Sequence, residues 1–497
     1  MVIGLGTGAS AGWLGAAPSF DRVDVVELEP AVVDVARDCT PINEDVLNNE
    51  RVRVIIGDAR EVLPTARDRY DLIMSAPSNP YRAGIASLFT REYYQAVDER
   101  LAEGGIFLQW MQDYEVDART IQTVYATIGT AFPFVETWVS KSGSDMILVA
   151  TRKELRHDLA ALSKRVSEEP YRSALLRAWG VNGVEGLFSG FVAAPGLAED
   201  LAKGPQAEVS TDDNSLVEFG FARSVGRTGL FDLAELRAYA EEHGYDQPNV
   251  VGTLNKERVA ELRIARTIAE NRFPVGLKIP PGPVGHRYRA RQSYAWGDLK
   301  SALMHWQSQN NEPDNPTDRT LLSEAMAVAG SDAGEALIQT LSKDQPLTAS
   351  VLRARWLASR GQLPKARSTM LQALKDYQTN PWPMPTVMKR ALELAQQLAM
   401  GDRDFAMKLF GLLREPFSLD LLSIERTTLR ARIGFGLDFQ NLCVDALAPL
   451  EPHVPWEEEI LKARASCYSI HKHERLDLAR AELVQFLNQE PPHLSTN

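Results

Sequence analysis

The sequence contains little cysteine. Its three cysteines, Cys39, Cys443 and Cys467, lie far apart along the 497 residues and form neither a metal-ligand spacing nor an evident disulfide set. Disulfides are rare where cellular reductants keep thiols reduced, so this usage suits a reducing compartment. We expect all three cysteines to be small buried residues without a chemical role.

Long apolar runs are also missing. No segment approaches the ~18 consecutive apolar residues typical of a membrane span, and no signal peptide opens the chain. With 44% hydrophobic and 24% charged residues, the composition is ordinary for a soluble globular protein of two or three domains. The sequence therefore predicts a cytoplasmic protein with no membrane segment in this chain.

Positive charge is scarce, above all at the start of the chain. The net charge is −12 over the whole sequence, and residues 1–152 hold 22 Asp and Glu against 13 Lys and Arg, which is −9. Such a surface repels the phosphate backbone of nucleic acids and suits a small cationic substrate better. The simpler interpretation is that the negative charge only keeps the protein soluble and does not select a substrate.

Histidine is absent before His157, which excludes a Ser/His/Asp set from the first part of the chain. His471 and His473 are two residues apart and would point away from each other on a helix, so we expect no metal site there. Asp212 and Asp213 form an acidic pair, which we interpret as a turn before a strand rather than as a cation site.

Residues 1–152 alternate short apolar runs, rich in Val and Ile, with helical segments. This alternation predicts a parallel sheet that helices cover on both faces. The last two runs are joined only by residues 140–144, too few for a helical crossover, and should form an antiparallel hairpin. This doubly wound α/β (Rossmann-like) layout is that of class I S-adenosylmethionine-dependent methyltransferases and their relatives. The predicted strands are Val2-Ile3, 23–28, 52–56, 71–76, 105–110, 134–139 and 145–150.

The composition changes further along the chain. Residues 153–272 form a mixed extension, with helix-like segments at 154–166 and 254–271. Residues 273–285 are rich in Pro and Gly, which is typical of a linker. From residue 286 to 497 the pattern is helical, and we expect a separate domain there.

The helical region repeats a short pattern, in which a Gly is followed after five residues by Ala and after four more by a large apolar residue. Small residues where two helices touch, with a bulky one filling the gap, are what stacked helix pairs require, and residues 354–381 resemble a tetratricopeptide repeat. Such a domain would bind a protein partner; a plain helical bundle is the alternative. The copies are Gly297/Ala302/Trp306, Gly361/Ala366/Met370 and Gly401/Ala406/Phe410, with Glu474 in place of Gly before Ala479 and Leu483.

Three polar or glycine-rich features follow consecutive predicted strands of the first region. GLGTG (4–8) follows the first strand, where glycines let the backbone approach a ligand closely. Glu27 ends the second strand, where an acid can accept hydrogen bonds from two ribose hydroxyls. Asp58 follows the third strand and could accept from an adenine amino group. Together they predict an adenosine-containing ligand.

These motifs resemble the spermidine synthase (polyamine aminopropyltransferase) family. The resemblance covers GLGTG, VVELEP (25–30), VRVIIGDAREVL (52–63) and ASLFTREYYQAVDERLAEGGIFLQW (86–110). PSNP (77–80) and STDDNSLVEF (210–219) resemble most closely the bacterial spermidine synthase-like proteins that are often fused to membrane transporter segments.

The resemblance implies that the substrate is decarboxylated S-adenosylmethionine or S-adenosylmethionine itself, with a polyamine-type acceptor and no metal. It implies that Glu27 holds the ribose and that Asp58 with Ala59 holds the adenine. The residues that would line the nucleoside pocket are Gly4, Gly6 and Gly8.

The sequence departs from the family in two places. Spermidine synthases carry an Asp-Ser-Ser-Asp-Pro-like loop after the fourth strand, and here Ala76 and Asn79 stand where its two aspartates belong. Ser78 and Asn79 occupy this catalytic loop but cannot take a proton near neutral pH. The small β-rich domain that precedes the glycine loop in the family is not in this sequence. We therefore expect a fragment of a longer, membrane-anchored or soluble gene product, or else a chain without half of the substrate site.

Two classes of function remain open. The first is a transferase that acts on decarboxylated S-adenosylmethionine, or on S-adenosylmethionine as a methyltransferase does. The second is a catalytically inactive nucleoside-binding or scaffold protein that acts through its helical repeats. Glu27 and Asp58 favour a ligand site in both classes, whereas Ala76 and Asn79 favour the second.

The change of composition at residues 273–285 generates a first prediction. If residues 286–497 fold separately, limited proteolysis of the full chain should cut first between about Phe273 and Gly285, because exposed Pro- and Gly-rich segments are preferred cleavage sites. Mass spectrometry of the first fragments checks this. Early cuts within the repeats, with 273–285 protected, would contradict the division.

Overall fold

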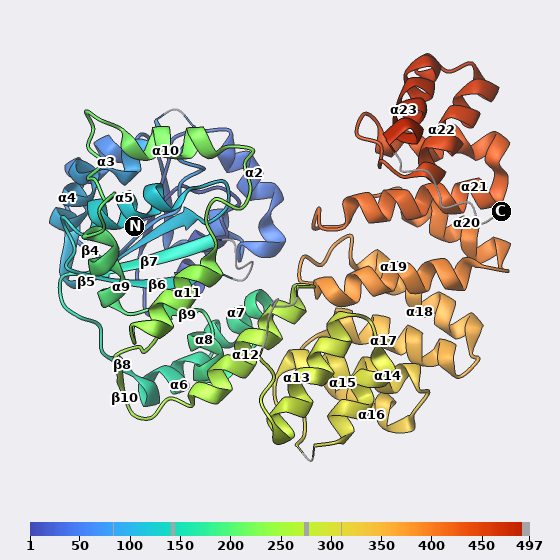
Figure 1. Cartoon of the computed structure of the whole chain (residues 1–497), viewed down its shortest axis with the longest axis horizontal. Coiled ribbons are helices and arrows are strands. Elements are labelled where there is room, and N and C mark those ends of the chain that lie inside the picture. The colour runs from blue at the N-terminus through green and yellow to red at the C-terminus, as the bar shows by residue number, and fades with distance from the viewer. Residues whose placement is uncertain (83, 141–144, 273–277, 310, 490–497) are drawn as a thin grey trace. The chain divides into compact units, whose positions relative to one another are not determined.

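The computed structural model describes the chain except for residues 83, 141–144, 273–277, 310 and 490–497 (Figure 1). By their internal contacts the residues fall into two compact units, Met1–Leu277 with Asn315–Thr317 and Lys278–Asp314 with Asp318–Asn497. Part of the expected linker, 273–277, lies outside the described residues. The finer division at residue 152 stays a prediction.

The first unit is built on one mixed sheet. Its described residues form eight strands in the order β3-β2-β1-β4-β5-β7-β6-β9. Strands β3, β2, β1, β4 and β5 are parallel, whereas β7 is antiparallel to both β5 and β6. The predicted doubly wound sheet with an antiparallel hairpin is therefore confirmed. The strands are β1 (Val2–Ile3), β2 (Val23–Glu27), β3 (Val52–Ile56), β4 (Tyr70–Ser75), β5 (Leu101–Gln112), β6 (Phe134–Val139), β7 (Asp145–Thr151) and β9 (Phe191–Ala193).

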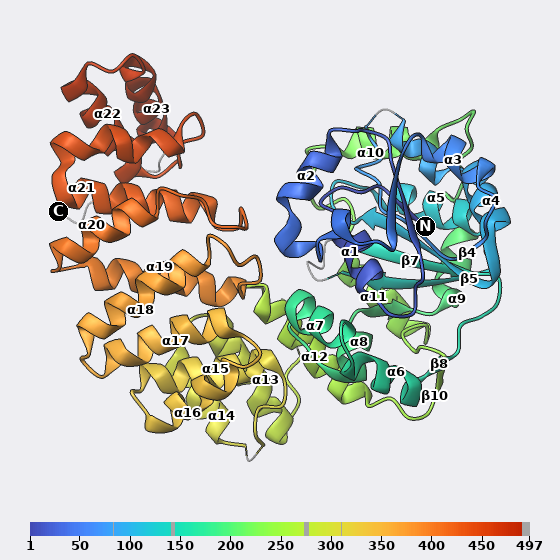
Figure 2. The ribbon, with the colours of Figure 1, turned by 180° about the vertical axis from the view of Figure 1, so that it is seen from behind.

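Helices cover both faces of the sheet because its central strand is apolar on both sides. Successive side chains of a strand point to opposite faces, and both Val2 and Ile3 are buried. Val2 packs in a core with residues of α1 (Ala9–Ala16) and α2 (Val32–Asp38), the helices that lie in front of the sheet in Figure 2. Ile3 belongs to the larger core that includes α3 (Ala59–Thr65), α4 (Arg91–Arg100) and α5 (Ala118–Ile128).

The strand β9 was not predicted from the sequence. It pairs antiparallel with β6, and the ring of Phe191 lies 5.1 Å from that of Trp138. Three apolar residues carry no readable period, so pairing with β6 decides their conformation. The other elements of this unit are β8 (His157–Asp158), β10 (Val250–Val251), α6 (Leu159–Ser167), α7 (Tyr171–Ala174), α8 (Gly183–Phe188), α9 (Pro195–Ala202), α10 (Leu216–Ser224), α11 (Leu233–Glu242) and α12 (Lys256–Ala269).

The acidic pair Asp212-Asp213 precedes a helix, so the prediction of a following strand was wrong. In the helix α10, Val217 and Phe221 are fully buried and Phe219 is 58% exposed. The four-residue spacing of the buried side chains is that of one helical face.

The second unit is helical throughout its described elements. Gly297, Gly361 and Gly401 have positive φ and follow directly after α13, α17 and α19, so each allows the chain to leave one helix and enter the next. The assignment to tetratricopeptide-like repeats stays a prediction. The helices are α13 (Gly282–Ala295), α14 (Leu299–Gln307), α15 (Pro316–Val328), α16 (Asp332–Leu341), α17 (Pro346–Ser359), α18 (Leu363–Asp376), α19 (Pro385–Ala399), α20 (Arg403–Leu412), α21 (Ser423–Leu447), α22 (Glu458–His471) and α23 (Leu476–Gln489).

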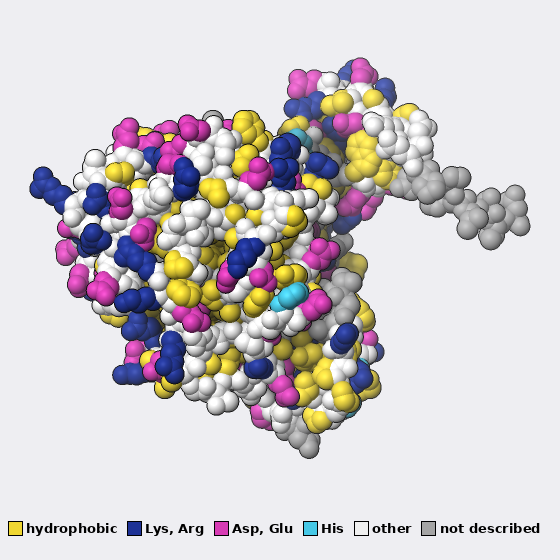
Figure 3. Space-filling view, turned by 60° about the vertical axis from the view of Figure 1, so that its left-hand side comes forward, with side chains coloured by type: hydrophobic (Ala, Val, Ile, Leu, Met, Phe, Trp, Pro, Cys, Tyr) yellow, Lys and Arg dark blue, Asp and Glu magenta, His cyan; other side chains and the backbone are white. Residues whose placement is uncertain are grey.

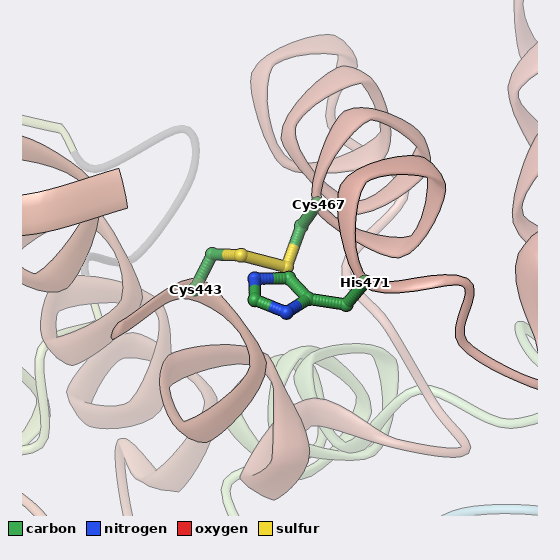
Figure 4. A group of neighbouring side chains, drawn as sticks. All are labelled: Cys443, Cys467 and His471. Atoms are coloured by element: carbon green, nitrogen blue, oxygen red, sulfur yellow. A yellow bond between two sulfur atoms is a disulfide. The ribbon is translucent and has the colours of Figure 1, made fainter. Parts of the chain in front are cut away.

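The cysteines agree only in part with the expectation: Cys443 and Cys467 are buried as predicted, but the predictions of no disulfide and of a buried Cys39 were wrong. Cys443 and Cys467 form a disulfide between α21 and α22 (Figure 4), and Cys39 is only partly buried. The two cysteines are 24 residues apart, so their spacing did not predict the disulfide. Only the packing of α21 against α22 brings their Cα atoms to 6.0 Å from each other.

The surface has mixed charge on the face shown in Figure 3, where Lys and Arg side chains are interspersed with Asp and Glu. None of the helices in the described part of the chain combines the length and the apolar character that crossing a lipid bilayer requires.

Candidate functional site

The glycine loop leaves the carboxyl end of β1, at the centre of the sheet. Hydrogen bonds fix it on both sides: Gly4 N donates to Val26 O of β2 (2.8 Å), and Ala76 N, after β4, donates to Ile3 O (3.0 Å). Gly4 has φ 92°, and a Cβ there would lie 2.7 Å from Ala76 O. Glycine is thus required at position 4 for the loop to pack against the chain that follows β4.

Gly6 differs from its neighbours because the space beside it is open. It has φ 52°, and a Cβ added there would meet no atom within 4 Å. At Gly8, by contrast, a Cβ would lie 2.7 Å from Val46 Cγ1. Packing explains Gly4 and Gly8, whereas Gly6 offers a bare, exposed stretch of backbone that a ligand can approach. A ligand contact by all three glycines stays a prediction.

Asn43 holds the glycine loop by hydrogen bonds, a role that was not predicted from the sequence. Its side chain is fully buried, and Nδ2 donates to Thr7 O (2.8 Å) and to Ala36 O (2.7 Å). An Asn shortly after a helix usually indicates a turn, so nothing in the sequence distinguished this residue. Its amide joins the glycine loop to the end of α2.

Glu27 is buried, with 8% of its surface exposed, and both of its carboxylate oxygens accept backbone hydrogen bonds. Oε2 accepts from Leu5 N (2.8 Å), and Oε1 accepts from Glu29 N (3.0 Å). Each carboxylate oxygen has two lone pairs, so the group retains capacity for two hydroxyl donors. Glu27 therefore orders the glycine loop and can also bind a diol.

Asp58 begins α3, and its Oδ1 accepts a hydrogen bond from Arg60 N (2.8 Å). The residue is exposed, and Ala59 beside it is buried. One oxygen of Asp58 thus has a structural role as the helix cap, which satisfies a backbone N–H that the helix leaves free. Adenine recognition by the other oxygen and by Ala59 stays a prediction.

The STDDN turn is tied to the start of α3 and α4. The Arg60 guanidinium donates to Thr90 Oγ1 (2.9 Å) and to Asp212, and Thr90 Oγ1 donates to Asp212 Oδ1 (2.7 Å). Burial raises the pKa of Asp212, but the hydrogen bonds from Arg60 and Thr90 together lower it further, so that the pKa lies below its usual value. Asp212 therefore forms an ion pair with Arg60 and lies in a turn, as the sequence predicted.

The loop after β4 presents amide and hydroxyl groups and no carboxylate. Asn79 Nδ2 donates to Gln112 Oε1 and, at 3.3 Å, to the Tyr114 hydroxyl. Gln112 is fully buried, and its Nε2 donates to Tyr114 O (2.7 Å). Ser78 is exposed. Gln112 and Tyr114 were not predicted as part of the site, although polar residues at the carboxyl end of a strand, here β5, are candidates for one.

Two carboxyl groups follow β5. Burial, together with the neighbouring charge of Asp145, raises the pKa of Asp113 to about 6. Glu115 has φ 50°, and its Oε1 accepts a hydrogen bond from Gly226 N (2.9 Å). A carboxyl group with a pKa near 6 can exchange a proton near neutral pH, so Asp113 is a candidate acid or base.

The predicted residues meet at one edge of the sheet. The glycine loop, Glu27 and Asp58 follow β1, β2 and β3, and Asn79 follows β4. The chain leaves β1 toward β2 on one side, and β4 lies on the other side. In open α/β sheets, ligands bind in the crevice at such a switch in strand order. We therefore expect a ligand crevice at this switch, and the two loops that would form its walls are the glycine loop and the loop from Ala76 to Pro80.

Comparison with known proteins gives a partial match. Residues 1–141 match the model of the spermine/spermidine synthase domain. Among curated proteins, the polyamine aminopropyltransferase of Clostridium beijerinckii is 29% identical over 140 residues, which are 28% of this chain and 49% of the relative. The enzyme of Clostridium perfringens is 31% identical over 135 residues, 27% of this chain and 47% of the relative. The chain spans about half the length of these relatives.

Solved structures give low overall similarity. A spermidine synthase in complex with the transition-state analogue AdoDATO is 20% identical, with a TM-score of 0.26, and the match covers 31% of this chain and 52% of that one. The spermidine synthase from Thermotoga maritima is 22% identical, with a TM-score of 0.27 and coverage of 31% and 53%. Residues 1–141, which include the glycine loop and the loop from Ala76 to Pro80, are therefore similar in sequence to the spermine/spermidine synthase domain.

Proposed function

We propose that the first unit binds an adenosine-containing nucleoside of the decarboxylated S-adenosylmethionine type, and that this chain by itself has little or no aminopropyltransferase activity. The observation that carries the proposal is the contrast between the two walls of the crevice. Glu27 and the glycine loop retain the groups that a nucleoside needs, whereas the opposite loop carries Ala76 and Asn79 in place of acids.

The contrast matters because of the chemistry of the acceptor. A primary amine has a pKa near ~10 and arrives as ammonium, which must be held and deprotonated before its nitrogen can attack the carbon beside the sulfonium. The Asn79 amide is already donating to Gln112, and an amide does not take up a proton near neutral pH. Binding and chemistry are thereby separated at this site.

Asp113 is the residue that would serve as base if the chain is active. Its pKa of about 6 lies close to the working pH, as an efficient general base requires. It follows Gln112 directly and so lies near the loop that holds Asn79. This interpretation keeps an aminopropyltransferase as the alternative, with a polyamine as acceptor.

Two other functions are compatible with the same crevice. A methyltransferase would use S-adenosylmethionine itself, and the doubly wound sheet supports that chemistry as well. A scaffold would use the nucleoside as a structural ligand and the helical unit for a protein partner. Relative affinity for decarboxylated S-adenosylmethionine, S-adenosylmethionine and 5′-methylthioadenosine, measured by calorimetric titration, distinguishes the first of these from the proposed function.

The first prediction for the site concerns Glu27. Replacing Glu27 by Gln should weaken 5′-methylthioadenosine binding by about 1.5 to 3 kcal/mol, the range for hydrogen bonds to a charged group. Calorimetric titration of the full chain measures the change. Glu29→Gln is the matched control, since it removes the same charge from an exposed residue two positions further on. Equal affinities for both variants would exclude Glu27 from the nucleoside site.

The second prediction restores the missing acids. The double variant Ala76→Asp with Asn79→Asp should bind putrescine more tightly by about 1 to 3 kcal/mol, because a charge-assisted bond then forms to the ammonium group. Ser78→Asp, which adds an acid to the exposed residue of the same loop, should have a much smaller effect. An equal gain from Ser78→Asp would indicate general charge attraction and would contradict the specific site.

The third prediction uses the pKa of Asp113. The folded value of about 6 lies above the unfolded value of ~3.9, so ionised Asp113 destabilises the fold fully above about pH 7 and not at all below about pH 4. Asp113→Asn should therefore stabilise the first unit by about 1 to 2 kcal/mol at pH 8, after discounting for partial exposure. Urea unfolding should show no gain at pH 4. Asp71→Asn, at an exposed position of β4, is the control, and a gain independent of pH would refute the assignment.

A further inference from the structure

The disulfide of the second unit has an imidazole beside it. Cys443 lies on α21, and Cys467 and His471 lie on α22 (Figure 4). The two sulfur atoms and one ring nitrogen of His471 all lie within 4.8 Å of one another. Both cysteines are fully buried, whereas His471 is exposed, so the cluster is open to solvent only on the imidazole side.

The spacing of these residues is that of metal ligands. Cys467 and His471 are four residues apart on one helix and therefore project from the same face. Cys443 comes from the neighbouring helix and faces both. Two thiolates and one imidazole are a ligand set that Zn²⁺ prefers, and three protein ligands leave a fourth position for water.

We propose that reduction of the Cys443–Cys467 disulfide creates a zinc site made of these two cysteines and His471. The site lies in the helical unit and is independent of the function proposed for the crevice. In the disulfide the two sulfur atoms are bonded to each other and are not thiolates. The chain can therefore hold either the disulfide or the metal, but not both. The second unit would thus bind zinc only in its reduced state.

The chemistry balances with a dithiol or a phosphine as reductant. A dithiol transfers two electrons and two protons to the disulfide, the S–S bond breaks, and two thiols form while the dithiol closes to its own disulfide. Zn²⁺ then displaces one proton from each thiol to solvent and forms two S–Zn bonds and one N–Zn bond. With a phosphine, phosphorus attacks one sulfur, the S–S bond breaks, and one water molecule supplies the oxygen of the phosphine oxide and the two protons of the thiols.

The imidazole is already held against the helix that carries Cys443. His471 Nε2 is hydrogen-bonded to Gln440 O of α21 (2.7 Å), three residues before Cys443. This bond orients the ring toward the cysteine pair without needing the disulfide. Reduction therefore leaves the ring beside the cysteine pair, but the two sulfur atoms must move apart, and a metal bound by Nε2 would replace the bond to Gln440 O.

The neighbouring His473 is not part of the cluster. Its ring stacks on Tyr468 at 4.0 Å, and its Nδ1 accepts a hydrogen bond from Arg475 N (3.2 Å). In the sequence, the spacing of two residues connected His471 only with His473. The relevant partner was Cys467, which stands one helical turn before His471, and the third ligand came from a helix that no sequence spacing connects to it.

The experiment uses the full chain with Co²⁺ as a spectroscopic probe and Zn²⁺ in equilibrium dialysis. After reduction by a phosphine, we expect one ion per chain and a thiolate-to-cobalt charge-transfer band in the near ultraviolet. The oxidised chain should show neither. Absence of the band from the reduced chain, or equal Zn²⁺ binding by the two forms, would overturn the proposal.

Variants separate the site from adventitious binding. Cys443→Ser with Cys467→Ser should abolish the charge-transfer band, and His471→Ala should weaken Zn²⁺ binding at least tenfold, since even the loss of an outer partner of a ligand costs about 10- to 100-fold. His473→Ala and Cys39→Ser are the matched controls and should bind as the unmodified chain does. His471 is exposed, so its variant tests the site even if the buried serines disturb folding. Binding unchanged in His471→Ala, or weakened equally in His473→Ala, would exclude His471 as a ligand.

Discussion

The carboxylate of Glu27 holds together the part of the molecule on which the proposed function depends. It accepts the backbone N–H of Leu5 in the glycine loop and of Glu29 after β2, and it does so while nearly buried. A buried carboxylate is stable only if its oxygens are hydrogen-bonded, so the loop and the acid fix each other's positions. Asn43 completes this arrangement by binding Thr7 O from the opposite side.

The two walls of the expected crevice, the glycine loop and the loop from Ala76 to Pro80, present different chemical groups. The glycine loop packs closely on the loop after β4, because Gly4 lies against Ala76 O, and it leaves bare backbone at Gly6. The other wall ends in Asn79, whose amide is held by Gln112 and Tyr114 at the end of β5. In the proposed function the glycine loop and Glu27 would bind the nucleoside, whereas transfer to an amine would need a proton acceptor in the loop after β4. The sheet thus positions both walls, and the residue types decide which of the two functions remains.

The sequence was sufficient for the sheet and for the placement of the loops, because strands such as 52–56 and 134–139 have a strong apolar pattern between clear turns. It failed where tertiary contacts decide the conformation. The strand β9 forms only by pairing with β6, and the segment after Asp212-Asp213 is a helix because α10 packs through Val217 and Phe221. Asn43 and the Cys443–Cys467 pair depend on contacts between distant segments, which no local pattern encodes.

The central claim is that nucleoside binding and aminopropyl transfer are separated in this chain. The most direct measurement incubates the unmodified full chain with decarboxylated S-adenosylmethionine and putrescine and follows the release of 5′-methylthioadenosine, with calorimetric titration of 5′-methylthioadenosine on the same preparation. The account predicts saturable nucleoside binding without putrescine-dependent release. Robust release that depends on putrescine would contradict it and would transfer the role of base to Asp113.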